Sequence, residues 1–219
     1  MEEGNAMKLK TIPWSNNENN TYTMKIRQED GRIKNIGSME LRIEHNDTTT
    51  KFISNINIDS IKYNEMNITE ADNETLEPSN SCIEWHSDNI GAKLTVSYKR
   101  RHVLLVANTG TDEHSKKVPF TGSIFDSMQL LFVIRCLDFA ETDVFNIEVL
   151  SGVIGTISEV VVRYIGEEVF EKDNEQIKCI RISLESSIEQ KSRQFLLYSA
   201  CEKRELIRWT RGNQCIELD

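Results

Sequence analysis

The chain is built largely from short segments in which apolar and polar residues alternate. The first segment starts at Thr21: apolar side chains at positions 22, 24 and 26 alternate with polar ones, and the turn-favouring pair Asp30-Gly31 follows. Because successive side chains of a strand point to opposite faces, this period of two predicts half-buried antiparallel strands. Later repeats bring the total to about ten strands or more, at the spacing of a barrel or sandwich. The apolar residues of these repeats include Met39, Leu41, Ile43, Leu94, Val96, Ile147, Val149, Val160, Val162, Ile182, Leu184, Leu206 and Ile216.

One segment breaks this alternation. From Ile124 to Phe139 the sequence is apolar almost all round, interrupted by Gln129 and Arg135, and it has no period of two. A helix without a polar face must be enclosed by other structure, and sheet is the only abundant material in this chain. We therefore expect a buried helix over residues 124–139, with the strands curving around it.

The polar stretches between these segments predict the domain layout. Asn-rich sequence at 16–20 suggests a flexible lead-in over residues 1–20, and the stretch 64–80 suggests a long loop. No shift in composition marks a boundary in the remainder. We expect one β-rich domain over residues 21–219, a length at which β barrels and sandwiches still form single units.

Composition argues against several classes of partner. The chain has 219 residues, with 35 acidic against 26 basic ones and a net charge of −9, which disfavours binding to phosphate backbones. The basic run 99–102 is interpreted as a solvated strand end. No apolar stretch approaches the ~20 residues that span a bilayer, so we expect neither nucleic acid nor a transmembrane segment.

The five cysteines, Cys82, Cys136, Cys179, Cys201 and Cys215, are odd in number and form no C-x-x-C pair. This spacing indicates neither a zinc site nor a disulfide framework, and reduced thiols are typical of the cytosol. The first residues are acidic and carry no visible signal peptide, which also favours a cytoplasmic protein. The protein would instead be exported if its native form carries a signal that this sequence lacks.

Motifs for enzymatic chemistry are scarce. The phosphate cradle G-x-x-x-x-G-K-[ST] and the nucleophile elbow G-x-S-x-G are absent, and the four histidines lack the spacing of metal ligands, so no metal or cofactor is expected. Glu84, His86 and Asp88 form the richest local group, with a general base and an orienting carboxylate on one side of a regular strand. Such groups also arise by composition on strand exteriors.

The large aromatic residues provide another candidate site. Trp85, Tyr98, Phe132, Tyr164 and Trp209 all lie on expected strands or on the buried helix. Ordinary core packing explains aromatic residues in such positions. The alternative is that a curved sheet of this many strands encloses more volume than one short helix fills, in which case these residues line a cavity for an apolar ligand.

Three segments resemble an uncharacterised bacterial family, a domain of unknown function whose members are mostly exported. Phe125–Phe139 looks like the single helix of that family, Thr75–Pro78 like a loop, and Leu206–Trp209 like its closing strand. In that family a long curved antiparallel sheet wraps one helix, reminiscent of lipoprotein-carrier half-barrels. The resemblance implies that Asp126 caps the helix and that Arg135 ends it against a strand carboxylate. No established activity accompanies the family.

The sequence thus predicts a mainly β protein, a curved antiparallel sheet or incomplete barrel enclosing one helix. Our leading hypothesis is a non-enzymatic protein that binds an apolar or amphipathic small molecule inside the sheet. One alternative is an interaction module with a solid core that pairs through a sheet edge. A further alternative is a hydrolase-like enzyme using Glu84, His86 and Asp88. No heptad or other association signal in the sequence indicates an oligomeric state.

Overall fold

The computed structural model describes residues 9, 12–14, 17–88, 90–186 and 193–219, which form one curved sheet of 15 strands. Strands β1 to β8 are consecutive neighbours, β10 to β15 are consecutive neighbours, and pairing of β1 with β15 joins the two sets. Every pairing is antiparallel except the short parallel one between β9 and β10. The predicted fold class is confirmed.

The first set consists of β1 (Asn17–Arg27), β2 (Ile33–His45), β3 (Thr49–Ile58), β4 (Tyr63–Asp72), β5 (Pro78–Ser87), β6 (Ile90–Lys99), β7 (His102–Asn108) and β8 (Glu113–Pro119). A 3-10 turn at Asp59–Ile61 connects β3 and β4. The second set consists of β9 (Phe125–Asp126), β10 (Val144–Ser151), β11 (Thr156–Lys172), β12 (Glu175–Ser186), β13 (Gln194–Ser199), β14 (Leu206–Arg211) and β15 (Gln214–Leu218).

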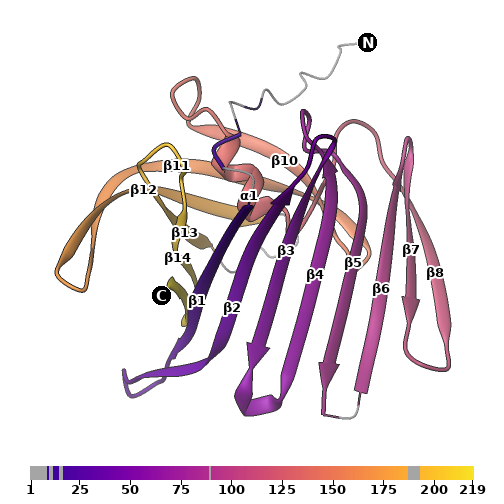
Figure 1. Ribbon diagram of the computed structural model, residues 1–219, viewed down its shortest axis with the longest axis horizontal. Coiled ribbons are helices and arrows are strands. Elements are labelled where there is room, and N and C mark those ends of the chain that lie inside the picture. The colour runs from indigo at the N-terminus through magenta and orange to yellow at the C-terminus, as the bar shows by residue number, and fades with distance from the viewer. Residues whose placement is uncertain (1–8, 10–11, 15–16, 89, 187–192) are drawn as a thin grey trace.

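The sheet curls into an incomplete barrel with its core on the concave side. Figure 1 shows β1 to β8 standing side by side, β10 to β14 crossing behind them, and α1 between the two sets. The main core joins buried side chains from both sets to those of the helix, among them Tyr22, Met39, Phe52, Ile182 and Leu196. The enclosing arrangement expected from the sequence is therefore present.

A second contact brings the far end of the sheet back against its first half. Leu150 of β10 and Ile124 pack on the inner face of β5 to β7 in a separate apolar cluster. Gly152, in the turn after β10, lies so close to that face that an added Cβ would be 3.2 Å from Ile83 Cδ1. Lys116 Nζ of β8 donates to the Gly155 carbonyl at 2.7 Å. Side chains, rather than a hydrogen-bonded ladder, bring this end of the barrel together.

The predicted helix at 124–139 is much shorter in the structure. Helix α1 covers Leu130–Val133 and continues as a 3-10 turn over Ile134–Cys136. Phe125 and Asp126 instead pair with β10, which removes the start of the predicted segment from the helix. All seven residues from 130 to 136 are buried, as the apolar pattern requires.

Two predictions of irregular structure were wrong. The stretch 64–80 holds most of β4 and the start of β5, separated by a short turn. Strand β1 starts at Asn17, within the predicted lead-in, and Trp14 is already buried; the remainder of that lead-in, apart from Leu9, Ile12 and Pro13, lies outside the described residues. Polar residues are tolerated in β4 because some of them bond inside the sheet: buried Asn67 donates through Nδ2 to Ser54 Oγ.

Candidate functional site: an apolar cavity beside the helix

A half-open cavity of about 260 Å³ lies between the start of the helical segment and the inner face of β10 to β14. This is close to the lower end of the volumes usual for small-molecule sites. The described lining residues are Ser127, Met128, Leu130, Leu131, Val149, Ser151, Ile154, Ser158, Val160, Leu184, Ser186, Gln194, Trp209 and Arg211.

The cavity has an apolar interior and a polar border. Val149, Val160 and Leu184 are buried and come from three successive strands, and Leu130 and Leu131 face them from the helix. Toward one end of the sheet, the next inner-face position of each strand holds a polar residue. The polar residues are Ser151 of β10, Ser158 of β11, Ser186 of β12, Gln194 of β13 and Arg211 of β14.

Strand pairing places this border at one end of the sheet. Leu184 pairs with Gln194, and Gln194 pairs with Arg211, so these side chains lie next to one another on adjacent strands. The Trp209 indole nitrogen donates to Gln194 Oε1 at 2.9 Å, which fixes the ring on the cavity wall. The arrangement suits a molecule with an apolar body and a polar end.

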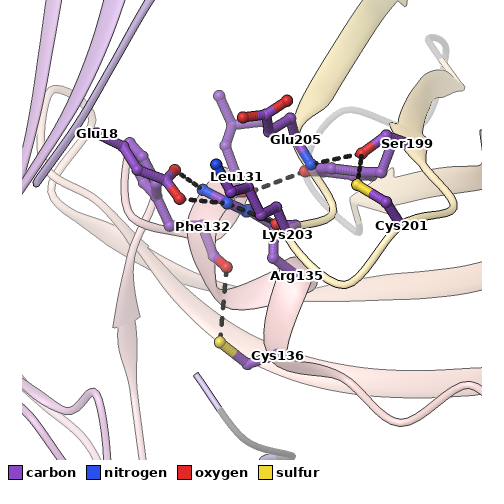
Figure 2. Close-up of polar contacts among 10 residues, drawn as sticks. Glu18, Leu131, Phe132, Arg135, Cys136, Ser199, Cys201, Lys203 and Glu205 are labelled. Atoms are coloured by element: carbon purple, nitrogen blue, oxygen red, sulfur yellow. Dashed lines mark hydrogen bonds and ion pairs between the residues drawn. The ribbon is translucent and has the colours of Figure 1, made fainter. Parts of the chain in front are cut away.

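A buried ion pair fixes the end of the helical segment that lies away from the cavity. Arg135 donates to both carboxylate oxygens of Glu18 on β1, at 2.8 and 3.2 Å, and to the Lys203 carbonyl at 2.6 and 3.1 Å (Figure 2). The side chains of Arg135 and Glu18 are only 4% and 8% exposed. The expected contact of Arg135 with a strand carboxylate is confirmed. Tyr198 of β13 adds a bond from its hydroxyl to the Leu131 carbonyl at 2.8 Å.

Asp126 does not cap the helix as the resemblance implied. Its Oδ1 accepts the Met128 backbone N–H at 3.0 Å, and its Oδ2 accepts the Tyr98 hydroxyl at 2.8 Å, while the residue before α1 is Gln129. Burial raises the pKa of this carboxyl above its usual value. Asp126 therefore ties the segment before the helix to β6, whereas Arg135 ties the end of the helical segment to β1.

The five aromatic candidates do not meet in one site. Trp209 lines the cavity. Phe132 is buried and packs on Phe52 at a ring separation of 4.8 Å, and Tyr164 stacks on Phe139 at 5.8 Å. Trp85 and Tyr98 belong to the separate cluster of β5 to β7. Four of the five are thus placed in core packing, while the ligand role of Trp209 stays a prediction.

The enzyme candidate is an exterior group. Glu84 and His86 lie on the outer face of β5, and Glu84 forms an ion pair with Lys93 at 2.5 Å. Asp88 sits in the turn after the strand, with a left-handed φ of 50°, and its carboxylate is 3.8 Å from Lys62 Nζ. Both contacts are ion pairs exposed to solvent. Strand β5 ends at Ser87, so the regular strand that would align the three side chains does not reach Asp88. Among the described residues no group of three His, Cys, Asp or Glu side chains could hold a metal ion.

One thiol differs from the others. Cys201 is exposed in the turn between β13 and β14, next to the Ser199 hydroxyl at 3.1 Å (Figure 2). Burial acts to raise the pKa of Cys201, but hydrogen bonds from Ser199 and from the backbone N–H groups of Lys203 and Arg204 outweigh it and lower the pKa. Burial raises the pKa of the other four thiols, that of Cys136 to about 12.

Sequence reasoning missed most of the cavity residues. The signal was present: in several alternating segments the apolar series ends in a polar residue, as in Ile147, Val149 and Ser151, or Ile182, Leu184 and Ser186. Reading that signal requires the strand order, because only pairing shows that these polar ends lie side by side.

No helix among the described residues is both long and apolar enough to cross a membrane. No protein-family model matches the chain, and no curated protein does. Among solved structures, the chain is similar to a crystal structure titled as a beta-barrel-like protein of the domain of unknown function DUF1849 from Brucella abortus, with a TM-score of 0.62 and 9% identity. The match covers 97% of this chain and 98% of that one. At this identity the likeness shows a shared β-barrel-like fold.

Proposed function

We propose that this protein binds an apolar or amphipathic small molecule in the cavity beside α1, without converting it chemically. The observation that carries the proposal is the cavity itself: about 260 Å³ of half-open space between the helix and β10 to β14. A concave, mostly apolar site with a few convergent polar groups is the usual form of a small-molecule site. A carrier role is part of this proposal, because the family that the sequence resembles has an architecture reminiscent of lipoprotein-carrier half-barrels.

The sheet edge formed by β8 supports this choice over pairing with a partner strand. The edge strand β8 carries Lys116 and Lys117, and charged edges with lysine disfavour strand addition. The cavity, by contrast, offers apolar surface that a ligand would remove from water.

Two neighbouring valines of β11 give a matched test. Val160 faces the cavity and is buried, whereas the half-buried Val161 points to the opposite face. Val160→Phe fills part of the cavity, and Val161→Phe adds the same bulk outside it. Both variants are first compared with the wild type by circular dichroism and thermal unfolding.

The readout is binding of a fluorescent fatty-acid analogue, together with native mass spectrometry of the gently purified protein. We expect Val160→Phe to weaken probe binding by about tenfold or more, equal to ~1.4 kcal/mol, and Val161→Phe to bind like the wild type. Equal binding by all three proteins, or no binding by folded wild type, would rule out this function.

A further inference from the structure

The sheet overlaps itself where its second half reaches back to its first half. Val149 of β10 faces the cavity, so its neighbour Leu150 points to the opposite face of the strand. Leu150 and Ile124 pack there on the inner face of β5 to β7, a contact that we call the overlap. The other buried residues of the overlap are Ile83, Leu94, Val96, Val103 and Leu105.

The overlap is anchored at one end only. Near the connection between β8 and β9, the Tyr98 hydroxyl of β6 donates to Asp126 at 2.8 Å. Four residues earlier on β6, Leu94 lies against Gly152, where an added Cβ would be 3.2 Å from Leu94 Cδ2. This second end is closed by apolar contacts and by the bond from Lys116 Nζ to the Gly155 carbonyl. In the described part of the chain β8 pairs only with β7, so no backbone ladder joins it to β10 or β11.

The turn between β10 and β11 belongs both to the overlap and to the cavity. Leu105 of β7 is only 4% exposed, and its Cδ2 would be 3.7 Å from a Cβ added to Gly155. Ser151 and Ile154 line the cavity, and Ile154 is also 56% exposed. A movement of this turn would therefore uncover Leu105 and shift part of the cavity wall at the same time.

We infer that the overlap opens while the rest of the protein stays folded and, on the basis of the proposed function, that this opening admits the ligand to the cavity. The anchored end at Asp126 is the hinge, and the turn at 152–155 moves away from Leu105. Local opening requires less free energy than global unfolding where few apolar contacts and few backbone hydrogen bonds must break. Here one lysine bond and the side-chain contacts of a small cluster have to break, and the strand ladders stay intact.

The opening is tested by thiol labelling of two matched variants. Leu105→Cys and Leu41→Cys each replace an inner-face leucine that is 4% exposed, but Leu41 belongs to the main core on β2, which is paired on both sides. Peptide mass spectrometry separates the new thiols from the native ones, and the buried thiol of Cys136 reports global unfolding. Without urea, Leu105→Cys should react at least about tenfold faster than Leu41→Cys and Cys136. Equal rates that follow global unfolding as urea is added would overturn the opening.

Two neighbouring lysines of β8 provide a second test that leaves the core intact. Lys116→Met removes the bond to the Gly155 carbonyl, whereas Lys117 points to the opposite face of the strand, so that Lys117→Met is the control. Lys116→Met should speed the labelling of Leu105→Cys by about three- to tenfold. Association and dissociation of the fluorescent fatty-acid analogue should accelerate by a similar factor, with its affinity changed by less than about twofold. Lys117→Met should leave all of these rates unchanged.

The outcomes separate this inference from the proposed function. Faster labelling in Lys116→Met without faster exchange of the analogue would refute the overlap as the route of entry. Unchanged labelling in Lys116→Met would refute the role of its bond in closing the overlap. If the analogue does not bind the folded wild type, the proposed function and the route of entry both fail, whereas the labelling of Leu105→Cys still decides whether the overlap opens.

Discussion

Breaking the ion pair between Arg135 and Glu18 should destabilise the protein far more than breaking an exposed pair. Glu18→Gln keeps the size of the side chain and removes its charge, which leaves the guanidinium of Arg135 buried without a counter-charge. Since the two side chains are only 4% and 8% exposed, the expected loss is about 3–5 kcal/mol. A typical domain has about 5–15 kcal/mol in total, so the variant should be close to its folding threshold at room temperature.

A matched control and a double variant sharpen this prediction. Lys51 and Glu70 form a pair at 3.0 Å with side chains that are 39% and 37% exposed, so Glu70→Gln should cost only about 0.2–1 kcal/mol. Combining Glu18→Gln with Arg135→Met removes both charges, and should recover much of the loss. The resulting coupling energy should be about 2 kcal/mol or more.

The assay is urea unfolding followed by circular dichroism, with free energies compared only where the transition stays two-state and its slope is unchanged. A coupling energy below about 1 kcal/mol would place this pair with exposed ones. In that case the ion pair would not be what holds the helical segment against β1, and the role assigned to it would be wrong.

Three further predictions address the core, the thiols and the buried acid. Phe132→Asp should unfold the protein, because it combines the loss of a buried ring, which costs about 3–5 kcal/mol, with an unpaired buried charge. Arg101→Ala should cost about 0.5 kcal/mol or less. A Phe132→Asp variant that circular dichroism shows to be folded would contradict the enclosed helix. Because the pKa of Cys201 is lowered and that of Cys215 is raised, Cys201 should react first with an aromatic disulfide reagent near neutral pH. Cys201→Ser should remove the fast phase of the reaction. Equally fast reaction of Cys215 would refute the lowered pKa of Cys201. Since burial raises the pKa of Asp126, its contribution to stability is full below the unfolded-state pKa near 3.8 and is lost as the pH rises through the folded-state value. The stability of the wild type relative to Asp126→Asn should therefore fall as the pH rises from 4, and urea midpoints that run parallel across that range would count against it.

The alternation of apolar and polar residues predicted strands well where the environment of a residue depends on its neighbours in the sequence. The alternating segments around Met39, Val96 and Ile182 are strands because apolar residues at every second position need one covered face. The loop predicted over the Asn-rich stretch that forms most of β4 was wrong, because that prediction depended on composition alone. Asn67 is stable there since Ser54 on the adjacent strand bonds to its amide, a partner that local sequence does not reveal.

The sequence by itself determined the class of fold and the need to enclose an apolar helical segment, because both follow from the period and continuity of apolar residues. Tertiary structure decided the extent of that helix, since Phe125 and Asp126 pair with β10 instead of continuing it. It also decided the cavity and its border, because Ser186, Gln194 and Arg211 become neighbours only through strand pairing. A volume left between a sheet and a helix depends on how strongly the sheet curves, and that curvature is a property of all the strands together.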